Sequence, residues 1–228
     1  MRIAEIFYSL QGEGLLVGTP SVFIRTSGCN LRCVWCDTPY SSWKPEGEEW
    51  SLREILAQVK RYETSYVVVT GGEPLLAPEI EELTVRLKKA NCHITMETAA
   101  TIFKPIACDL VSLSPKLSNS TPWKREKSRF ARSHEGRRLN FPVMQQFMDG
   151  YDYQLKFVAD KRKDFAEIEK VLKKLKNVER DRILVMAQAR SKRELSEKAR
   201  WIVDLCKRHG FRYTPRLQIE LWGNRRGT

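Results

Sequence analysis

The sequence predicts an α/β fold in which strands and helices alternate as parallel βα units. Short β-rich runs alternate along the chain with longer amphipathic segments. The run at 66–70, YVVVT, is almost continuously β-branched, as expected of a strand that is buried on both faces. Two helices are expected to begin at capping boxes, Ser51 with Glu54 and Ser191 with Glu194.

The expected strands are short apolar or β-branched runs. In chain order they cover residues 21–26, 66–70, 93–97, 109–113, 153–158, 183–187 and 217–221. This gives six or seven strands, fewer than the eight of a complete barrel.

The expected helices carry apolar residues at helical spacing between the strands. They cover residues 51–62, 78–89, 163–176 and 191–209. Helix 163–176, for example, places Phe165, Ile168 and Leu172 on one face. Gly210 follows the last helix and is a typical C-terminal cap.

Residues 118–149 interrupt this alternation. The segment shows no clear periodicity, so we expect a long basic loop or a partly ordered insertion. Between Lys116 and Arg138 there are eight Lys and Arg residues against Glu126 and Glu135, a net +6 of the chain's +12. A solvated, mobile loop explains this charge; attraction of anionic substrates or of a nucleic acid also explains it.

The composition is that of a globular protein. The chain has 228 residues, of which 42% are hydrophobic, and we expect a single domain over residues 1–228. No apolar run approaches the roughly 20 residues of a membrane helix. The N-terminus lacks the layout of a signal peptide, so we expect a cytoplasmic location.

Three of the six cysteines, Cys29, Cys33 and Cys36, lie within eight residues directly after the strand at 21–26. Three thiolates on one loop can hold three irons of a four-iron cluster and leave the fourth iron open to a small molecule. The spacing differs from that of bacterial ferredoxins. A zinc site completed by Cys92, Cys108 or a histidine is the alternative. Otherwise, we expect Cys92, Cys108 and Cys206 to pack in the hydrophobic core as ordinary thiols.

A second motif, Thr70-Gly71-Gly72-Glu73-Pro74, follows the strand at 66–70. Glycines let a ligand approach the backbone closely, and a carboxylate beside them can accept an ammonium group. The same residues also suit an ordinary strand-to-helix turn.

The C-x3-C-x2-C spacing followed by Gly-Gly-Glu-Pro resembles the radical S-adenosylmethionine superfamily. The resemblance implies a partial (βα)6 barrel and a [4Fe–4S] cluster in the loop after the first parallel strand. It also implies that S-adenosyl-L-methionine binds the open iron and meets the backbone around Gly72 and Glu73.

More specific stretches are similar to 7-carboxy-7-deazaguanine synthases. They are residues 6–14, 23–25, 36–38, 96–98, 114–116 and 220–227. The resemblance implies a carbon–nitrogen lyase that converts 6-carboxy-5,6,7,8-tetrahydropterin to 7-carboxy-7-deazaguanine with loss of ammonia, for queuosine and other 7-deazapurines. It further implies an external electron donor of the flavodoxin or ferredoxin type and a homodimer, with neither a membrane nor a nucleic-acid partner.

Site residues follow from this resemblance, position by position. The cluster ligands are the three clustered cysteines, and Thr38 matches a ligand to Mg²⁺. The residues expected at the S-adenosylmethionine are Trp35, Asp37, Gly72, Glu73, Ser114, Pro115 and Lys116, with 154–157 as a further lining strand. The residues expected at the substrate are Leu10, Gln11, Gly12, Arg25 and Thr70, where the Arg25 fork suits a carboxylate.

The chain departs from the family pattern at two places, Ala99-Ala100-Thr101 and Gln218, where some relatives have glycine and histidine. Arg25 could instead form a strand-end salt bridge, and the 114–116 stretch could be a plain turn. We assign no functional role to the three histidines, His93, His134 and His209.

Two other functions fit parts of the sequence. A glycyl-radical activase of the same superfamily would share the cysteines and Gly-Gly-Glu-Pro, but has no need for residues 10–14 or Arg25. A zinc-containing RNA-binding protein would fit the charge of +12 and the cysteine loop.

Overall fold

The computed structural model describes all residues, 1–228, and is organised around one nine-stranded sheet. The strands lie in the order β3-β1-β2-β4-β5-β6-β7-β8-β9. Their bounds are β1 Arg2–Leu10, β2 Pro20–Thr26, β3 Glu48–Glu49, β4 Tyr66–Gly71, β5 His93–Thr98, β6 Leu110–Leu113, β7 Tyr153–Ala159, β8 Ile183–Ala187 and β9 Arg212–Tyr213. From β2 to β9 all neighbours are parallel, whereas β1 pairs antiparallel with β2 and β3.

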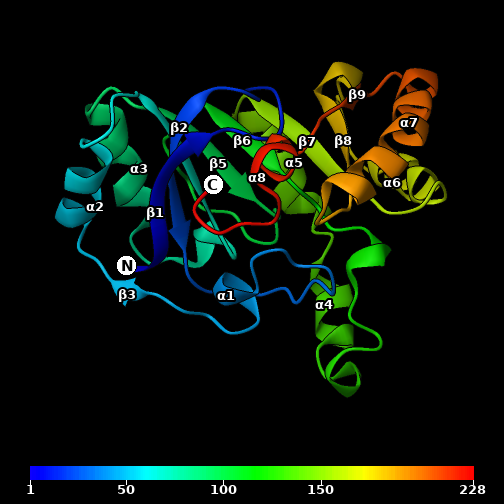
Figure 1. Cartoon of the computed structure of the whole chain (residues 1–228), viewed down its shortest axis with the longest axis horizontal. Helices are drawn as coiled ribbons and strands as arrows, with labels where there is room; N and C mark the ends of the chain where they lie inside the picture. The colour runs from blue at the N-terminus through cyan, green and yellow to red at the C-terminus, as the bar shows by residue number, and fades with distance from the viewer.

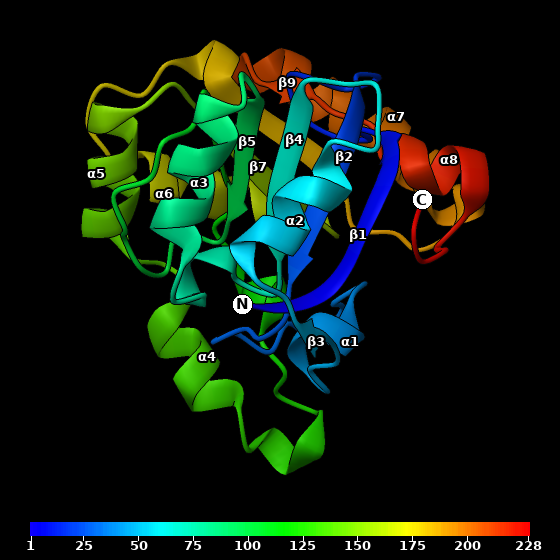
Figure 2. The same cartoon turned by 90° about the vertical axis from the view of Figure 1, so that its left-hand side faces the viewer.

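The helices are α1 Pro39–Ser42, α2 Leu52–Val59, α3 Ile80–Lys89, α4 Ala131–Arg137, α5 Phe141–Gly150, α6 Asp164–Leu172, α7 Lys192–His209 and α8 Leu217–Trp222. Of these, α2, α3, α5, α6 and α7 cover the outer side of the curved sheet, whereas α1, α4 and α8 lie outside this layer (Figures 1 and 2). The sheet ends at β3 and β9 without closing, so the fold is a partial α/β barrel, as the sequence predicts. None of the helices is both long and apolar enough to cross a membrane.

The core lies between the sheet and this helical layer. The three valines of β4 are at most 3% exposed, and every residue of β7 is buried. Apolar surface removed from water in this way stabilises the parallel sheet by about 25 cal/mol per Å².

Six of the predicted strands are confirmed with bounds within two residues.

The predicted helix starts are also confirmed. Ser51 accepts a hydrogen bond from the Glu54 amide, and Glu54 accepts one from the Ser51 amide, which completes the capping box. Ser191 caps α7 in the same way, but Glu194 accepts from the Arg190 amide instead. Gly210 closes α7 in the left-handed conformation.

The predicted strand at 217–221 is wrong, because these residues form α8. Their alternating apolar and polar pattern would place Leu217, Ile219 and Leu221 on one buried face. In the structure only Ile219 is buried, while Leu221 is 48% exposed. The seventh parallel strand is β9, and β1 adds an antiparallel strand that the sequence analysis did not anticipate.

The prediction of a long loop over residues 118–149 is also wrong. The segment contains α4 and nearly all of α5, together with two short 3₁₀ turns. Asn140 caps α5, and Met144, Phe147 and Met148 supply its buried face. Residues 118–138, which we call the arm, extend beyond the sheet beside α1 (Figures 1 and 2).

Candidate active site

A cavity of about 240 Å³ opens at the carboxyl ends of the parallel strands. All of the individually predicted site residues except Glu73 and Pro115 line it, whereas of the expected lining strand 154–157 only Lys156 does. The lining includes Leu10, Gln11, Gly12, Arg25, Cys29, Cys33, Trp35, Cys36, Asp37, Thr38, Thr70, Gly72, Ser114 and Lys116. The structure therefore brings together residues from five separate segments of the chain.

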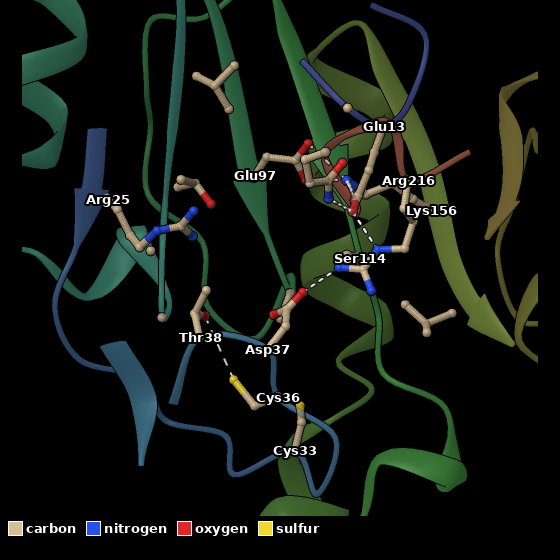
Figure 3. A pocket seen from close by; sticks show the side chains of 18 of the residues that line it. Glu13, Arg25, Cys33, Cys36, Asp37, Thr38, Glu97, Ser114, Lys156 and Arg216 are labelled. Carbon is tan, nitrogen blue, oxygen red and sulfur yellow. Dashed lines mark hydrogen bonds and ion pairs between the residues drawn. The ribbon is translucent and has the colours of Figure 1, made fainter. Parts of the chain in front are cut away.

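The three clustered thiols line the cavity on residues 28–38, which we call the cysteine loop. Figure 3 shows Cys33 and Cys36 at one end of the cavity. Burial raises the pKa of Cys29 to about 12 and raises the pKa of Cys33 as well. These thiols therefore ionise only beside a strong positive charge, and bound iron provides one. Sulfur donors from one loop around one cavity fit a [4Fe–4S] cluster.

A zinc site completed by Cys92 or Cys108 does not fit the arrangement. The proposed fourth ligands, Cys92 and Cys108, belong to the main hydrophobic core, whereas the clustered cysteines form a separate cluster with Leu31 and Ala99.

The cysteine loop is fastened to the arm by hydrogen bonds on both sides of Cys33. The Arg32 amide donates to His134 Nδ1 at 3.0 Å, and the Val34 amide donates to the Ser120 carbonyl at 2.8 Å. His134 Nε2 in turn lies 2.9 Å from Ser120 Oγ. The sequence analysis gave His134 no role; its place at the cysteine loop depends on a contact across 102 residues.

The glycines after β4 are required by the backbone of the cysteine loop. A Cβ on Gly72 would clash with the carbonyl oxygens of Gly28 and Ser41, and one on Gly71 would clash with Thr26. Gly72 lines the cavity at the same time. The two glycines therefore allow the loop to pack against the end of β4.

Glu73 faces away from the cavity and is 1% exposed. Its carboxylate accepts hydrogen bonds from Thr98 Oγ1 at 2.7 Å and from the Ala99 amide at 2.9 Å. Burial raises its pKa, and these hydrogen bonds only partly offset the effect. The side chain thus joins the ends of β4 and β5, and it does not line the cavity.

The opposite end of the cavity holds a buried charged network (Figure 3). Lys156 Nζ on β7 lies 2.9 Å from Glu13 and 2.8 Å from Glu97 on β5. Arg216 Nε donates to Glu13 at 3.0 Å, and its fork also contacts Asp37. Each of these residues lines the cavity.

The network keeps its members charged. Burial acts to raise the pKa of Glu13, but the charges of Lys156 and Arg216 outweigh it and lower that pKa. Burial acts to lower the pKa of Lys156, but Glu13 and Glu97 raise it. The Arg216 charge likewise lowers the pKa of Asp37 against the effect of burial. The cavity therefore offers fixed carboxylates as hydrogen-bond acceptors.

Sequence reasoning assigned no individual role to Glu13, Glu97 or Arg216, and it placed Lys156 only within the expected lining strand 154–157. One signal was available, because Lys156 interrupts the otherwise mostly apolar strand YQLKFVA. A buried lysine requires a carboxylate partner, although the sequence alone does not say which.

Arg25 both lines the cavity and forms an ion pair. Its Nε donates to Glu5 Oε1 at 2.6 Å, and Tyr40 donates to the same oxygen at 2.7 Å. Its two terminal nitrogens make no hydrogen bond to the protein, and in Figure 3 the guanidinium points into the cavity. The salt bridge to Glu5 therefore holds the guanidinium in this orientation. Its outer edge, which carries the two terminal nitrogens, remains available to bind a ligand.

Gln11, Gly12 and Gln218 lie close together beside the network. Gln218 Nε2 donates to Glu13 at 2.8 Å, while its buried Oε1 has no hydrogen-bond partner. That oxygen occupies the space that a Cβ on Gly12 would need. Gln218 thus places a buried acceptor beside the network that has no hydrogen-bond partner in the protein.

Comparison with known proteins agrees with this geometry. The model of the Radical SAM superfamily matches residues 23–119. The 7-carboxy-7-deazaguanine synthase of Rhodopirellula baltica is 45% identical over 100% of this chain and 89% of its own length. The enzyme of that name from Halobacterium salinarum is 42% identical over 98% of this chain and 91% of its own length.

A solved structure described as QueE from Escherichia coli has the same fold, with a TM-score of 0.69. It is 24% identical and the match covers 93% of this chain and 92% of that one.

Neither a glycyl-radical activase nor a zinc-containing RNA-binding protein is supported by the full-length relatives. The superfamily implies a [4Fe–4S] cluster, S-adenosylmethionine, a small-molecule substrate and an electron donor. The cavity and the full-length similarity together establish that the chain belongs to the 7-carboxy-7-deazaguanine synthase family of the Radical SAM superfamily, a family of lyases.

Proposed function

We propose that this chain converts 6-carboxy-5,6,7,8-tetrahydropterin to 7-carboxy-7-deazaguanine with loss of ammonia, in the biosynthesis of queuosine or related 7-deazapurines. One observation carries the proposal: the thiols, Arg25 and the buried carboxylates face the same cavity. The full-length similarity to proteins named for this product supports it.

The cysteine end of the cavity is the cofactor end in this proposal. Cys29, Cys33 and Cys36 would hold the cluster, which together with S-adenosylmethionine supplies a carbon-centred radical able to remove a hydrogen atom. Lys116 Nζ lies 2.7 Å from Ser114 Oγ, so one cation is fixed where the cofactor carboxylate would need it. Trp35, Asp37, Gly72 and the backbone of Glu73 and Pro115 complete the proposed cofactor contacts.

The opposite end would hold the pterin. The outer edge of Arg25 suits the substrate carboxylate. The carboxylates of Glu13 and Glu97, both paired with Lys156, suit the N–H groups of an aminopyrimidine ring, since a carboxylate accepts hydrogen bonds only. Leu10, Gln11, Gly12 and Thr70 line the space between.

Mg²⁺ is part of the proposal through Thr38. The Thr38 hydroxyl lines the cavity and accepts a hydrogen bond from Ser41 Oγ at 3.1 Å. The neighbouring Asp37 is already paired with Arg216. A magnesium ion here would therefore take most of its ligands from the substrate carboxylate and water, which is common for this ion.

The test is an anaerobic reaction with the reconstituted protein. S-adenosylmethionine, a reductant, Mg²⁺ and carboxytetrahydropterin are added, and 7-carboxy-7-deazaguanine and ammonia are measured by mass spectrometry and enzymatic assay. The Cys33→Ala protein is the negative control. Formation of 5′-deoxyadenosine without the deazaguanine would show that the cofactor chemistry is right and the substrate is wrong.

The proposed homodimer rests on the family resemblance. An exposed patch that includes Tyr8 and Trp222, 43% and 41% exposed, is available for such contact. Light scattering during size-exclusion chromatography measures the oligomeric state directly.

A further inference from the structure

The arm carries positive charge that nothing in the chain neutralises. Its exposed cations without an ion pair are Lys124, Lys127, Arg129, Arg132 and Arg137. Of the two acidic residues in the arm, Glu135 is bound to Arg138 and Thr121, which leaves Glu126 alone against five cations. Five positive charges on one small projection repel one another and create a positive potential. The arm therefore attracts an anionic partner.

The same surface has an apolar centre. Trp123 on the arm is 54% exposed, and Val34 at the outer side of the cysteine loop is 37% exposed. Arg125 joins the two segments, since its NH1 contacts the Val34 carbonyl at 3.4 Å. Exposed aromatic and aliphatic groups bordered by charges are typical of protein interfaces.

This surface lies directly outside the proposed cluster ligands. Val34 follows Cys33 in the chain, and its amide is hydrogen-bonded to Ser120 of the arm. Trp43 packs edge-on against Phe130 at 5.7 Å and donates to the Cys33 carbonyl at 2.9 Å. The arm and the cysteine loop are therefore one connected unit, and a partner bound to the arm lies beside the cluster loop.

We propose that the arm, together with Val34, is the docking surface for a small acidic protein that delivers electrons to the cluster. The inference rests on the proposed function, because it requires a cluster on the cysteine loop. In each transfer one electron leaves the donor, which is oxidised by one electron, and the cluster is reduced by one electron, with no bond formed or broken. Electron-transfer complexes use small interfaces, so the exposed surface of one short arm suits such a partner.

A protein donor fits the arm better than RNA. Proteins that bind single-stranded RNA use several stacking aromatics along a basic groove, whereas the arm exposes one tryptophan on a convex projection. The arm is also hydrogen-bonded to the cysteine loop, and binding beside that loop benefits an electron donor.

The test reverses charge on the arm and at a matched distant position. The arm variant is Lys124→Glu, Lys127→Glu and Arg132→Glu, three exposed residues without hydrogen bonds to other side chains. The control is Arg53→Glu, Lys60→Glu and Lys89→Glu, three exposed cations on or next to α2 and α3. Both change the net charge by −6. The probe is flavodoxin hydroquinone, a small acidic flavoprotein, and stopped-flow absorbance follows oxidation of its flavin by the reconstituted protein at several salt concentrations.

We expect the arm variant to lose at least about tenfold in the second-order rate at low salt, and to lose most of its salt dependence. The control should stay within about twofold of the original protein. Reduction by dithionite, followed by S-adenosylmethionine cleavage, should be equal in all three proteins. A Trp123→Ala variant should lower the rate at high salt, where steering is screened.

Equal rates for the arm variant and the control would overturn the inference. So would loss of transfer-RNA binding by the arm variant with an unchanged flavodoxin rate, since the arm would then be a nucleic-acid surface. Failure of the original protein to make deazaguanine with dithionite would instead count against the proposed function, and the flavodoxin rates would still decide the docking surface.

Discussion

Glu13 and Lys156 form a buried ion pair of 2.9 Å between the segment after β1 and strand β7, 143 residues apart in the chain. Their side chains are 12% and 4% exposed. Glu97 binds the same ammonium group from β5. One lysine therefore ties the N-terminal segment to the middle of the parallel sheet, at the end of the cavity where we place the substrate.

Replacement of this lysine should destabilise the fold. Lys156→Met leaves Glu13 and Glu97 buried without their shared cation, which costs about 3–5 kcal/mol. Urea unfolding measures the loss. The matched control is Lys161→Met, an exposed lysine on the loop after β7, and it should change the unfolding free energy by less than about 0.5 kcal/mol. Equal unfolding midpoints for the two variants would contradict the assigned role of the network.

His134 should make stability depend on pH in the acidic range. Burial lowers its pKa from 6.5 to about 4; the charges of Arg138 and Lys116 act in the same direction, and Glu135 opposes them. Between these two values the unfolded chain takes up a proton that the folded chain does not, so stability falls as the pH drops from 6.5 to 4.

The measurement compares the urea midpoint of the original protein with that of His134→Asn from pH 7.5 to pH 4.5. Asparagine keeps an acceptor for the Arg32 amide but does not titrate. The original protein should lose more stability on acidification than the variant. Parallel curves would mean that the imidazole is not held neutral in the fold.

A side chain at Gly72 should displace the cysteine loop. Gly72→Ala places a methyl group against the carbonyl oxygens of Gly28 and Ser41, and such overpacking costs about 1–3 kcal/mol. We also expect faster loss of iron to a chelator. Gly150→Ala at the end of α5 is the control, since a Cβ there meets no atom. Identical iron release by both variants would show that the loop tolerates the added methyl group.

The cluster itself should depend on Cys33, as one of its three proposed ligands, and not on the cysteines of the main hydrophobic core. Cys33→Ala should bind much less iron after anaerobic reconstitution and lack the brown absorption, while Cys206→Ala, a core thiol, should keep both. Circular dichroism checks that the variants are folded. Full iron binding by Cys33→Ala would remove the basis for the cluster assignment.

Much of the fold followed from local patterns. The β-branched run of β4 and the capping box of α2 specify their elements from neighbouring residues alone. The predicted strand 66–70 is one residue short of β4, and the predicted helix 51–62 begins at the observed cap but ends three residues beyond α2. Prediction was wrong at α8, where a six-residue alternating pattern suits a strand equally well. Only the position of these residues over the cavity, with the Leu217 amide bound to the Gly12 carbonyl, selects the helix.

For the site, the sequence by itself determined the cysteine triad and the Gly71–Gly72 turn, because their spacing places them on single loops after strands. Tertiary structure alone decided the partners of the charged groups. Glu13 meets Lys156, Asp37 meets Arg216, and His134 meets the Arg32 amide across more than 100 residues each. Such pairs depend on which strands are neighbours and on how deeply a charge is buried, and neither quantity is contained in the local spacing of residues.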